Sequence, residues 1–182
     1  HAAYRVGPDD ADKNWNSRSE LPNQLRFSRA KGALGSAFFS SRSLRRNNFG
    51  ISDSLRHSFY RYPALVPTMP WKDNLPPLAP ANLRAILNEQ DQLVIEWDAA
   101  ETASDGDNPW YYVVYRFAPD EKPGNADPSK IIGLVYHDTK FADLNAQPGE
   151  RYQYFVTSVD RLHNESRPVG PLRIRLKHAE EE

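Results

Sequence analysis

Short apolar runs separated by turn-forming residues dominate the second part of the chain. From residue 83 onward, stretches rich in β-branched and aromatic residues alternate with clusters of Gly, Pro, Asn, Asp and Ser. This pattern is typical of strands in a small antiparallel sandwich, and no interval between the runs accommodates a helix of ordinary length. The pattern predicts six strands, at residues 83–87, 92–98, 111–117, 131–137, 151–160 and 171–177.

The first part of the chain has helical spacing instead. Ser19 is a favourable N-cap residue, and Pro22 falls within the first turn that would follow it. Gly32 then marks a stop, so residues 20–31 predict a helix. Residues 51–62 carry apolar residues three or four positions apart and predict a second helix, opened by Ser52 or Asp53.

Two short apolar segments precede these helices. Residues 35–40 predict a buried strand, and residues 2–7 are consistent with the last residues of another strand. A strand, helix, strand, helix order is typical of parallel α/β architecture. Two such units are too few to close a barrel, and a lone parallel pair exposes both faces. Residues 1–75 therefore predict the end of a larger domain.

A proline-rich stretch marks the boundary between the two parts. Residues 63–80 contain six prolines, which prevent a regular helix or a central strand. The chain therefore divides into residues 1–75, a linker at residues 76–79, a sandwich at residues 80–178 and an acidic tail at residues 179–182. The predicted fold class is mixed, with a partial α/β segment followed by an all-β, immunoglobulin-like sandwich.

Composition narrows the classes of function. Residues 1–75 hold 12 Lys and Arg against 6 Asp and Glu, while the remainder holds 11 against 18. The cations of the basic part are dispersed among aromatic and helix-forming residues, so nucleic-acid binding is not predicted. The absence of Cys excludes disulfides and thiolate metal sites, and the five His are scattered without ligand spacing. No metal or cofactor is predicted.

The chain also lacks membrane and targeting signals. No apolar run approaches the roughly 20 residues that a membrane-spanning helix requires, so no membrane span is predicted. The start at His1 has neither an initiator Met nor the shape of a signal peptide, which favours a mature or excised fragment.

Residues 80–178 resemble a fibronectin type III domain along their whole length. Residues 93–97 resemble the second strand of that family with its core Trp, and residues 111–116 resemble the third strand. Residues 144–160 are similar to the turn, the tyrosine corner and the sixth strand, and residues 164–166 to the last loop. The resemblance implies the fibronectin type III form of the sandwich.

The residues of this segment assign the aromatic side chains to the core. Period two places Leu93, Ile95 and Trp97 on one face of a strand, and burial of a ring as large as that of Trp97 contributes a few kcal/mol. Tyr152 is expected to bond a nearby backbone group as a tyrosine corner. Trp110, beside a turn, is expected to contribute less. These assignments favour a core role over a sugar-stacking platform.

Residues 1–75 resemble the C-terminal end of the glycosyl hydrolase-like 10 family, which consists of bacterial (β/α)8-barrel proteins. The resemblance rests on residues 3–7, 20–24, 35–40, 48–50, 53–55 and 60–71. It implies that Tyr4 ends the seventh strand and that residues 20–31 form the seventh helix. It likewise implies that residues 35–40 form the eighth strand and residues 51–62 the last helix.

Four residues are the candidates for substrate binding. A barrel would place Arg5, Trp15, Ser40 and Arg42 at or just beyond the C-terminal ends of strands seven and eight, where sites of such barrels lie. A Trp there can stack on a sugar ring, and an Arg can bind hydroxyl groups or a carboxylate. The alternative is that Trp15 packs under its own loop and that the arginines face solvent.

No catalytic residue is assigned. Glycoside hydrolysis usually requires two carboxylates a few Å apart. Glu20 and Asp53 stand at helix starts, where an acid favourably meets the helix dipole. The loop containing Asp9, Asp10 and Asp12 is either a ligand contact or a solvated run. The Asn164 glycosylation motif is better explained as a turn.

These observations lead to a functional expectation with an open alternative. The chain is expected to be the C-terminal region of a bacterial glycoside-hydrolase-like protein acting on polysaccharide, inactive by itself, and periplasmic, surface-anchored or secreted. The alternative is a non-catalytic carbohydrate-binding, adhesion or spacer module at the cell surface. The expected partner is a glycan bound by the missing barrel. The severed edge at residues 37–39 is expected to pair with another copy, to fold against the sandwich or to be loosely ordered.

Overall fold

A computed structural model describes residues 1–124 and 127–176. The contacts divide the chain into two compact units, His1–Arg61 and Tyr62–Glu182. Residues 62–75, which the sequence groups with the first segment, therefore lie with the second unit. The domain limits at residues 75 and 80 come from the two family resemblances and stay a prediction. No helix within the described ranges has the length and hydrophobicity needed to cross a membrane.

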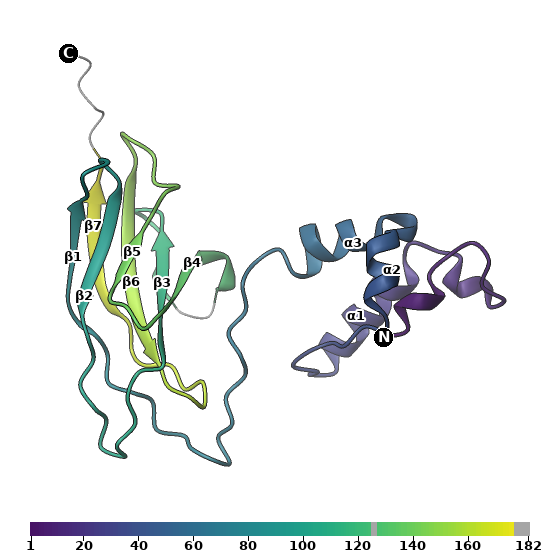
Figure 1. Cartoon of the computed structure of the whole chain (residues 1–182), viewed down its shortest axis with the longest axis horizontal. Coiled ribbons are helices and arrows are strands. Elements are labelled where there is room, and N and C mark those ends of the chain that lie inside the picture. The colour runs from purple at the N-terminus through teal and green to yellow at the C-terminus, as the bar shows by residue number, and fades with distance from the viewer. Residues whose placement is uncertain (125–126, 177–182) are drawn as a thin grey trace. The chain divides into compact units, whose positions relative to one another are not determined.

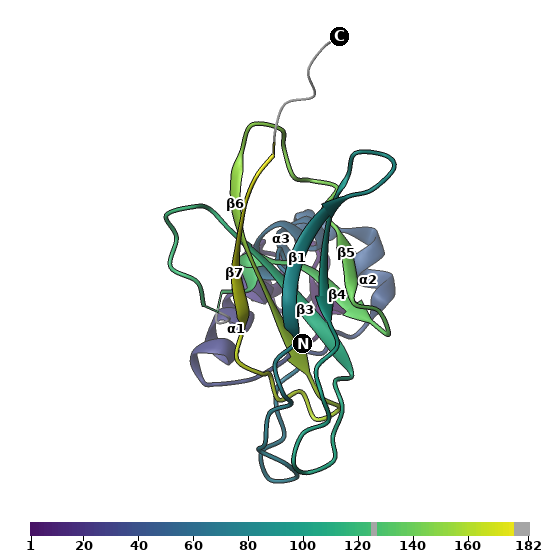
Figure 2. The ribbon, with the colours of Figure 1, turned by 90° about the vertical axis from the view of Figure 1, so that its left-hand side faces the viewer.

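The second unit is a sandwich of two antiparallel sheets (Figure 1). One sheet has the strand order β1-β2-β5 and the other β4-β3-β6-β7. The same sandwich is seen from its side in Figure 2, with β1 on the side that faces the viewer. The strands are β1 (Ala81–Leu87), β2 (Leu93–Asp98), β3 (Tyr111–Phe117), β4 (Ile131–Tyr136), β5 (Lys140–Ala142), β6 (Arg151–Val159) and β7 (Val169–Arg175).

These strands confirm the six runs that the sequence predicts, with shifts of one or two residues at most of the ends. The part of the last run beyond residue 176, and the acidic tail, lie outside the described residues. β5 was missed because three residues are too short a run to show alternation. The chain is thus mostly β-structure with few helices, and its three-plus-four sheets resemble a fibronectin type III or immunoglobulin-like sandwich.

The core between the two sheets contains the residues that the alternation places there. Trp97 is 1% exposed, and its ring meets that of Tyr112 edge-on at 5.3 Å. The tyrosine corner is confirmed, because the Tyr152 hydroxyl accepts a hydrogen bond from the Gln147 backbone N–H at 3.0 Å. The buried core members are Leu93, Ile95, Trp97, Tyr112, Val114, Val135, Tyr154 and Val156.

A second apolar cluster lies on the outer face of the four-stranded sheet. Its buried members include Val113 and Tyr115 of β3 and Phe155 of β6, and Leu65 of the proline-rich segment packs against them. The Ser158 hydroxyl donates to the Leu78 carbonyl, which ties the same segment to β6. Leu65 therefore covers part of a sheet face that carries aromatic side chains, and the Leu78 contact attaches the same segment to β6 at a second point.

The first unit is helical. It contains α1 (Glu20–Ala30), α2 (Ser41–Arg46) and α3 (Ile51–Ser54), and α3 continues as a π-helical turn, Leu55–Phe59. Three short 3₁₀ turns complete it, at Ala3–Arg5, Lys13–Trp15 and Asn48–Gly50.

Both predicted helices of the first unit are present, although their starts differ in detail. α1 matches the predicted range closely, and Gly32, with φ +81°, follows its end. The helix at residue 51 begins after Gly50 and not at Ser52 or Asp53. Asn47 takes the expected capping role, because its Oδ1 accepts from the Ser52 backbone N–H at 2.8 Å. α2 was not predicted, since six residues give too little periodicity.

The two predicted strands of the first unit are wrong. Residues 2–7 contain a 3₁₀ turn, and residues 35–40 form no strand. Residues 35–40 are also less buried than predicted, since Phe39 is 70% exposed. A parallel strand requires neighbours that complete its ladder, and the described unit supplies no sheet for these segments.

The first unit nevertheless has its own small core. Leu21 and Leu25 of α1 are fully buried, and Trp15 is 6% exposed. The other buried members are Ala3, Val6, Ile51 and Leu55. Helices α1 and α3 therefore pack on the turns that begin the chain.

Candidate functional site

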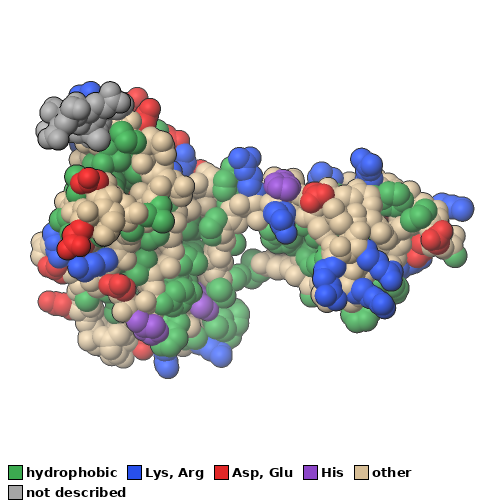
Figure 3. All heavy atoms as spheres, turned by 45° about the horizontal axis from the view of Figure 1, so that its top comes forward, with side chains coloured by type: hydrophobic (Ala, Val, Ile, Leu, Met, Phe, Trp, Pro, Cys, Tyr) green, Lys and Arg blue, Asp and Glu red, His purple; other side chains and the backbone are tan. Residues whose placement is uncertain are grey.

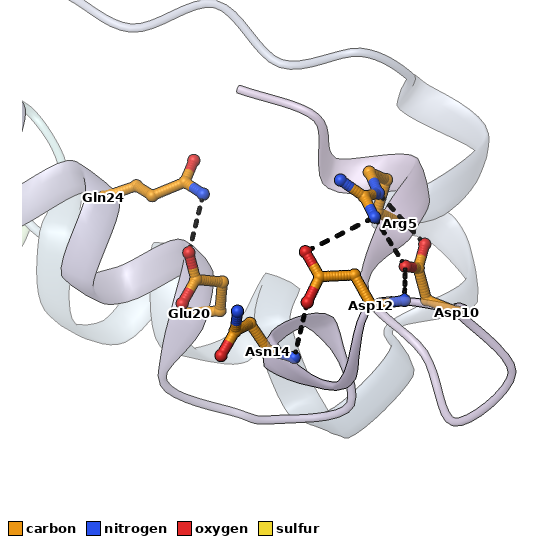
Figure 4. A network of polar contacts seen from close by, with 6 residues as sticks. All are labelled: Arg5, Asp10, Asp12, Asn14, Glu20 and Gln24. Carbon is orange, nitrogen blue, oxygen red and sulfur yellow. Dashed lines mark hydrogen bonds and ion pairs between the residues drawn. The ribbon is translucent and has the colours of Figure 1, made fainter.

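Arg5 is the centre of a polar network in the first unit (Figure 4). Its guanidinium donates two hydrogen bonds to the Asp10 carboxylate, at 2.7 Å and 3.1 Å. An Asp12 carboxylate oxygen lies 3.7 Å from the same guanidinium and is thereby within ion-pair distance. These two hydrogen bonds lower the pKa of Asp10 below its ordinary value and raise that of Arg5. The acidic loop is thus held in place by the cation that precedes it.

Trp15 lies beneath this network. Its ring is buried, and the Arg5 guanidinium carbon lies 5.0 Å from the ring centroid, which is a cation–π distance. The Trp15 backbone carbonyl accepts from the Gly7 N–H at 3.2 Å, so the loop closes over the indole. The structure therefore brings together two of the four predicted substrate-binding residues, Arg5 and Trp15.

The other two predicted residues stand at the start of α2. The Ser40 carbonyl accepts from the Ser43 N–H at 3.0 Å, which makes Ser40 the residue that opens the helix. Arg42 is exposed and makes no hydrogen bond or ion pair with any residue in the described ranges. Its guanidinium is therefore free to meet a ligand from solvent.

The carboxylates of the first unit are engaged with neighbours. Glu20 accepts from the Gln24 side-chain amide at 2.9 Å, one turn along α1 (Figure 4). Asp53 accepts from the Asn47 amide at 2.7 Å. A general acid requires a raised pKa, whereas that of Asp10 is lowered. The Asp10 carboxylate is therefore unsuited to the role of general acid.

A groove that the sequence did not indicate lies beside α2. It has a volume of about 610 Å³ and is lined by Leu44, Arg45, Asn47, Ser52, Asp53, Leu55, Arg56 and Tyr60. Figure 3 shows Lys and Arg side chains in blue on the His1–Arg61 unit, which contains 11 such residues against 5 Asp and Glu. Only the formation of α2 brings Arg45 and Arg56 to the same groove.

A smaller pocket lies at one end of the sandwich. It has a volume of about 340 Å³ and lies where β2 ends, β3 begins and β4 turns into β5. These strand ends are at the lower end of the sandwich in Figure 1. Trp110 lines it and is 45% exposed. The rings of Trp110 and His137 meet edge-on at 5.4 Å. The sequence places Trp110 beside a turn but gives no indication that His137 is its neighbour.

Three carboxylates gather in the same unit. Oxygens of Asp73, Asp107 and Asp160 lie within 4.8 Å of one another, and Asp160 is fully buried. The Asn164 side-chain amide bridges two of them, since it donates to Asp160 at 2.9 Å and to Asp73 at 3.2 Å. The burial of Asn164 supports its role as a turn residue and not as a glycosylation acceptor. The three acids come from distant turns, so the sequence did not indicate the cluster.

Comparison with known proteins relates the chain to one curated protein, and no family model matches it. The chain is 34% identical over 173 residues to glycosyl hydrolase YngK of Bacillus subtilis (strain 168). The alignment covers 91% of this chain and 32% of that protein, so the chain spans about a third of its relative.

Two solved structures show a likeness over a little more than half of this chain. A fibronectin type III-like protein from Clostridium thermocellum is 20% identical, with 58% of this chain and 98% of that chain covered and a TM-score of 0.40. The spore cortex lytic enzyme SleM of Clostridium perfringens is 15% identical, with 59% of this chain and 30% of that chain covered and a TM-score of 0.39. The fold assignment therefore rests on the strand order of the sandwich itself.

Proposed function

We propose that this chain is the C-terminal region of a bacterial glycoside-hydrolase-like protein that acts on polysaccharide. In this proposal residues 1–75 are the end of a (β/α)8 barrel and residues 80–178 an accessory fibronectin type III module. The observation that carries the proposal is the 34% identity to a protein named as a glycosyl hydrolase over 91% of the chain. An alignment of that extent includes most of both units, so the likeness goes beyond the sandwich.

The backbone of the first unit supports the barrel origin. The Phe39 N–H donates to the His1 carbonyl, and the Tyr4 N–H donates to the Phe39 carbonyl, both at 3.0 Å. The N–H and the carbonyl of Phe39 thus bond two different residues of the facing segment, as a residue in a parallel pair does. Consecutive strands of a (β/α)8 barrel are parallel neighbours. These two bonds are what would remain of the seventh and eighth strands.

The proposed substrate contacts follow from that origin. Active sites of such barrels are built by the loops that follow the strands. Arg5 and Trp15 belong to the segment after the seventh strand, and Ser40 and Arg42 to the segment after the eighth. In the complete barrel Arg5, Ser40 and Arg42 would contact the sugar, and the buried Trp15 would support the Arg5 guanidinium from beneath. The catalytic carboxylates would come from earlier strands. A polysaccharide substrate places the protein outside the bacterial cytoplasm, in the periplasm, at the surface or in the medium.

Self-association of the chain by itself is part of the same proposal. Tyr4 is 60% exposed, Phe39 is 70% exposed, and their rings meet edge-on at 5.7 Å. In the complete barrel the preceding strands would cover these rings. In the isolated chain a second copy would do so, because exposed apolar patches tend to find partners. Light scattering of the wild type and of Phe39→Ser measures this, and a monomeric wild type contradicts it.

The second candidate function is non-catalytic glycan binding by the sandwich. The partly exposed Trp110, in a pocket with polar neighbours, favours it. This candidate requires no hydrolysis by any part of the protein.

An activity screen separates the two candidates. The longer protein and the chain of residues 1–182 are incubated with the same panel of bacterial and plant polysaccharides, and released reducing ends are measured. The longer protein is expected to cleave at least one of them, and the chain none. Turnover by the chain would contradict the proposal, since Glu20, Asp53 or the loop at residues 9–12 would then perform the chemistry. Inactivity of the longer protein would leave the binding function.

A further inference from the structure

The pocket at Trp110 combines an accessible indole with polar side chains whose hydrogen-bonding capacity is only partly used by the described residues. Trp110 is 45% exposed, although its backbone is fixed, because its N–H donates to the Val159 carbonyl at 2.7 Å. The ring is therefore presented to solvent from a rigid strand start and not from a mobile tip. A large exposed aromatic ring on a fixed backbone is a low-cost contact surface for a ligand.

Four polar side chains line the same pocket, namely Tyr112, His137, Asp138 and Thr139. The Tyr112 hydroxyl accepts from the Ala100 N–H at 3.2 Å, and no residue in the described ranges accepts its proton. The His137 ring contacts the Trp110 ring, and neither nitrogen of the imidazole forms a hydrogen bond with any described residue. Asp138 accepts from the Thr139 N–H at 2.6 Å through one oxygen, and its other oxygen has no hydrogen-bond partner among the described residues. Donors and acceptors thus surround one aromatic ring.

The backbone holds His137 in this position at a cost. His137 has φ +58°, a left-handed conformation that few residues other than Gly adopt. It is the residue directly after β4, so the strain sits at the rim of the pocket. Strained residues persist where surrounding contacts over-determine them, often at binding sites. Here the left-handed conformation accompanies the edge-on contact between the His137 and Trp110 rings.

The charge around the pocket selects the kind of ligand. Asp138 lines it, Asp107 precedes Trp110 by three residues, and Asp160 follows the Val159 that binds Trp110. Lys and Arg side chains are absent from the lining. Within the lining an anionic sugar would meet the Asp138 carboxylate and no Lys or Arg, although Lys140 is close enough to interact with Asp138 electrostatically. An uncharged pyranose can stack its apolar C–H face on the indole and bond its hydroxyls to the rim. The volume of about 340 Å³ lies at the small end of the range for ligand pockets.

We propose that this pocket binds a single uncharged hexose or N-acetylhexosamine unit of a glycan chain, with Trp110 as the stacking ring and His137 and Asp138 as hydrogen-bonding groups. The inference rests on the proposed association with polysaccharide, but it requires no hydrolysis. It places a glycan contact on the sandwich itself, separate from Arg5, Trp15, Ser40 and Arg42.

Binding by the full chain tests this inference. Cellotetraose and the tetramer of N-acetylglucosamine are titrated calorimetrically at millimolar concentrations, with tetragalacturonate as the anionic probe. At least one uncharged probe is expected to bind, and tetragalacturonate to bind more weakly. Trp110→Ala is expected to weaken that binding by about tenfold or more, because the stacking surface is removed. Trp110→Phe is expected to lose less.

Trp71→Ala is the matched control. Trp71 is 76% exposed and does not line the pocket, so its substitution removes a surface indole and leaves the lining of the pocket unchanged. It is expected to leave affinity unchanged, and thermal melts of all variants check that each remains folded. Absence of binding by both uncharged probes, preference for the anionic probe, or unchanged affinity of Trp110→Ala would each overturn the inference.

This test fails separately from the proposed function. If the longer protein cleaves a polysaccharide while Trp110→Ala binds like the wild type, only the inference about the pocket is lost. If Trp110-dependent binding is measured while the longer protein shows no hydrolysis, the pocket stands and the hydrolytic proposal is lost.

Discussion

The sandwich and the helical unit satisfy their backbone polar groups in different ways. Every strand from β1 to β7 finds an antiparallel partner within residues 81–175. Residues 35–40 instead keep isolated bonds to residues 1–4 and extend no ladder. Antiparallel strands can pair with neighbours in the chain, whereas parallel strands depend on distant ones. The two strands predicted in the first unit therefore lack the neighbours that would complete a ladder, whereas its helices form from bonds within each helix.

The largest loss of stability is expected from a substitution in the core of the sandwich. Trp97→Ala is expected to reduce the free energy of unfolding by about 3–5 kcal/mol, as large aromatic truncations do, because the ring is 1% exposed. Trp110→Ala is expected to cost less than about 1 kcal/mol, since the ring is partly exposed. Denaturant titration measures both. Equal losses would mean that the strand register of β2 is wrong.

The core of the helical unit gives the next effect. Leu25→Ala removes a fully buried side chain and is expected to destabilise the first unit by about 2–5 kcal/mol. Phe27→Ala on the same helix is the control, because Phe27 is 66% exposed. Hydrogen exchange of the two units reports each separately. An equal loss of protection in the β3 and β6 amides would show that the units unfold as one.

Alkaline pH should act on the sandwich through Tyr111. Burial raises the pKa of Tyr111 from 10.0 to about 12. Because the folded pKa lies above the unfolded one, its stabilising contribution is complete below pH 10.0 and is lost as the pH rises toward about 12. Two pH units correspond to at most about 2.7 kcal/mol. Melting temperatures between these pH values should fall less steeply for Tyr111→Phe, and an unchanged slope contradicts the assignment.

The smallest effect concerns the proline-rich segment. A polypeptide of residues 77–176 is expected to unfold cooperatively, because all seven strands are present. Residues 62–176 should be more stable by about 1–2 kcal/mol, since Leu65 then covers the outer face of β3 and β6. Leu65→Ser in the longer form should remove most of that gain. Equal melting temperatures of the two lengths would mean that the segment is a free linker.

The alternation of residues was sufficient for the sandwich but not for its pocket. Trp97 and Tyr152 occupy the places that period two and the tyrosine corner predict, since these depend on neighbours along the chain and on one repeated geometry. Trp110 and His137 are far apart in the sequence, and no local pattern joins them. Only the pairing of β3 with β4 brings their rings to 5.4 Å.

The same division holds in the helical unit. Ser19 and Gly32 flank α1 as the sequence predicts, because start and stop signals act within a turn or two, although the Ser19 side chain makes no capping hydrogen bond. The sequence also indicated the acidic loop at residues 9–12, but it did not indicate that Arg5 is the partner of Asp10. The pairing of Arg5 with Asp10 and the burial of Trp15 beneath it were decided by tertiary structure, which alone determines which charges and rings lose contact with water.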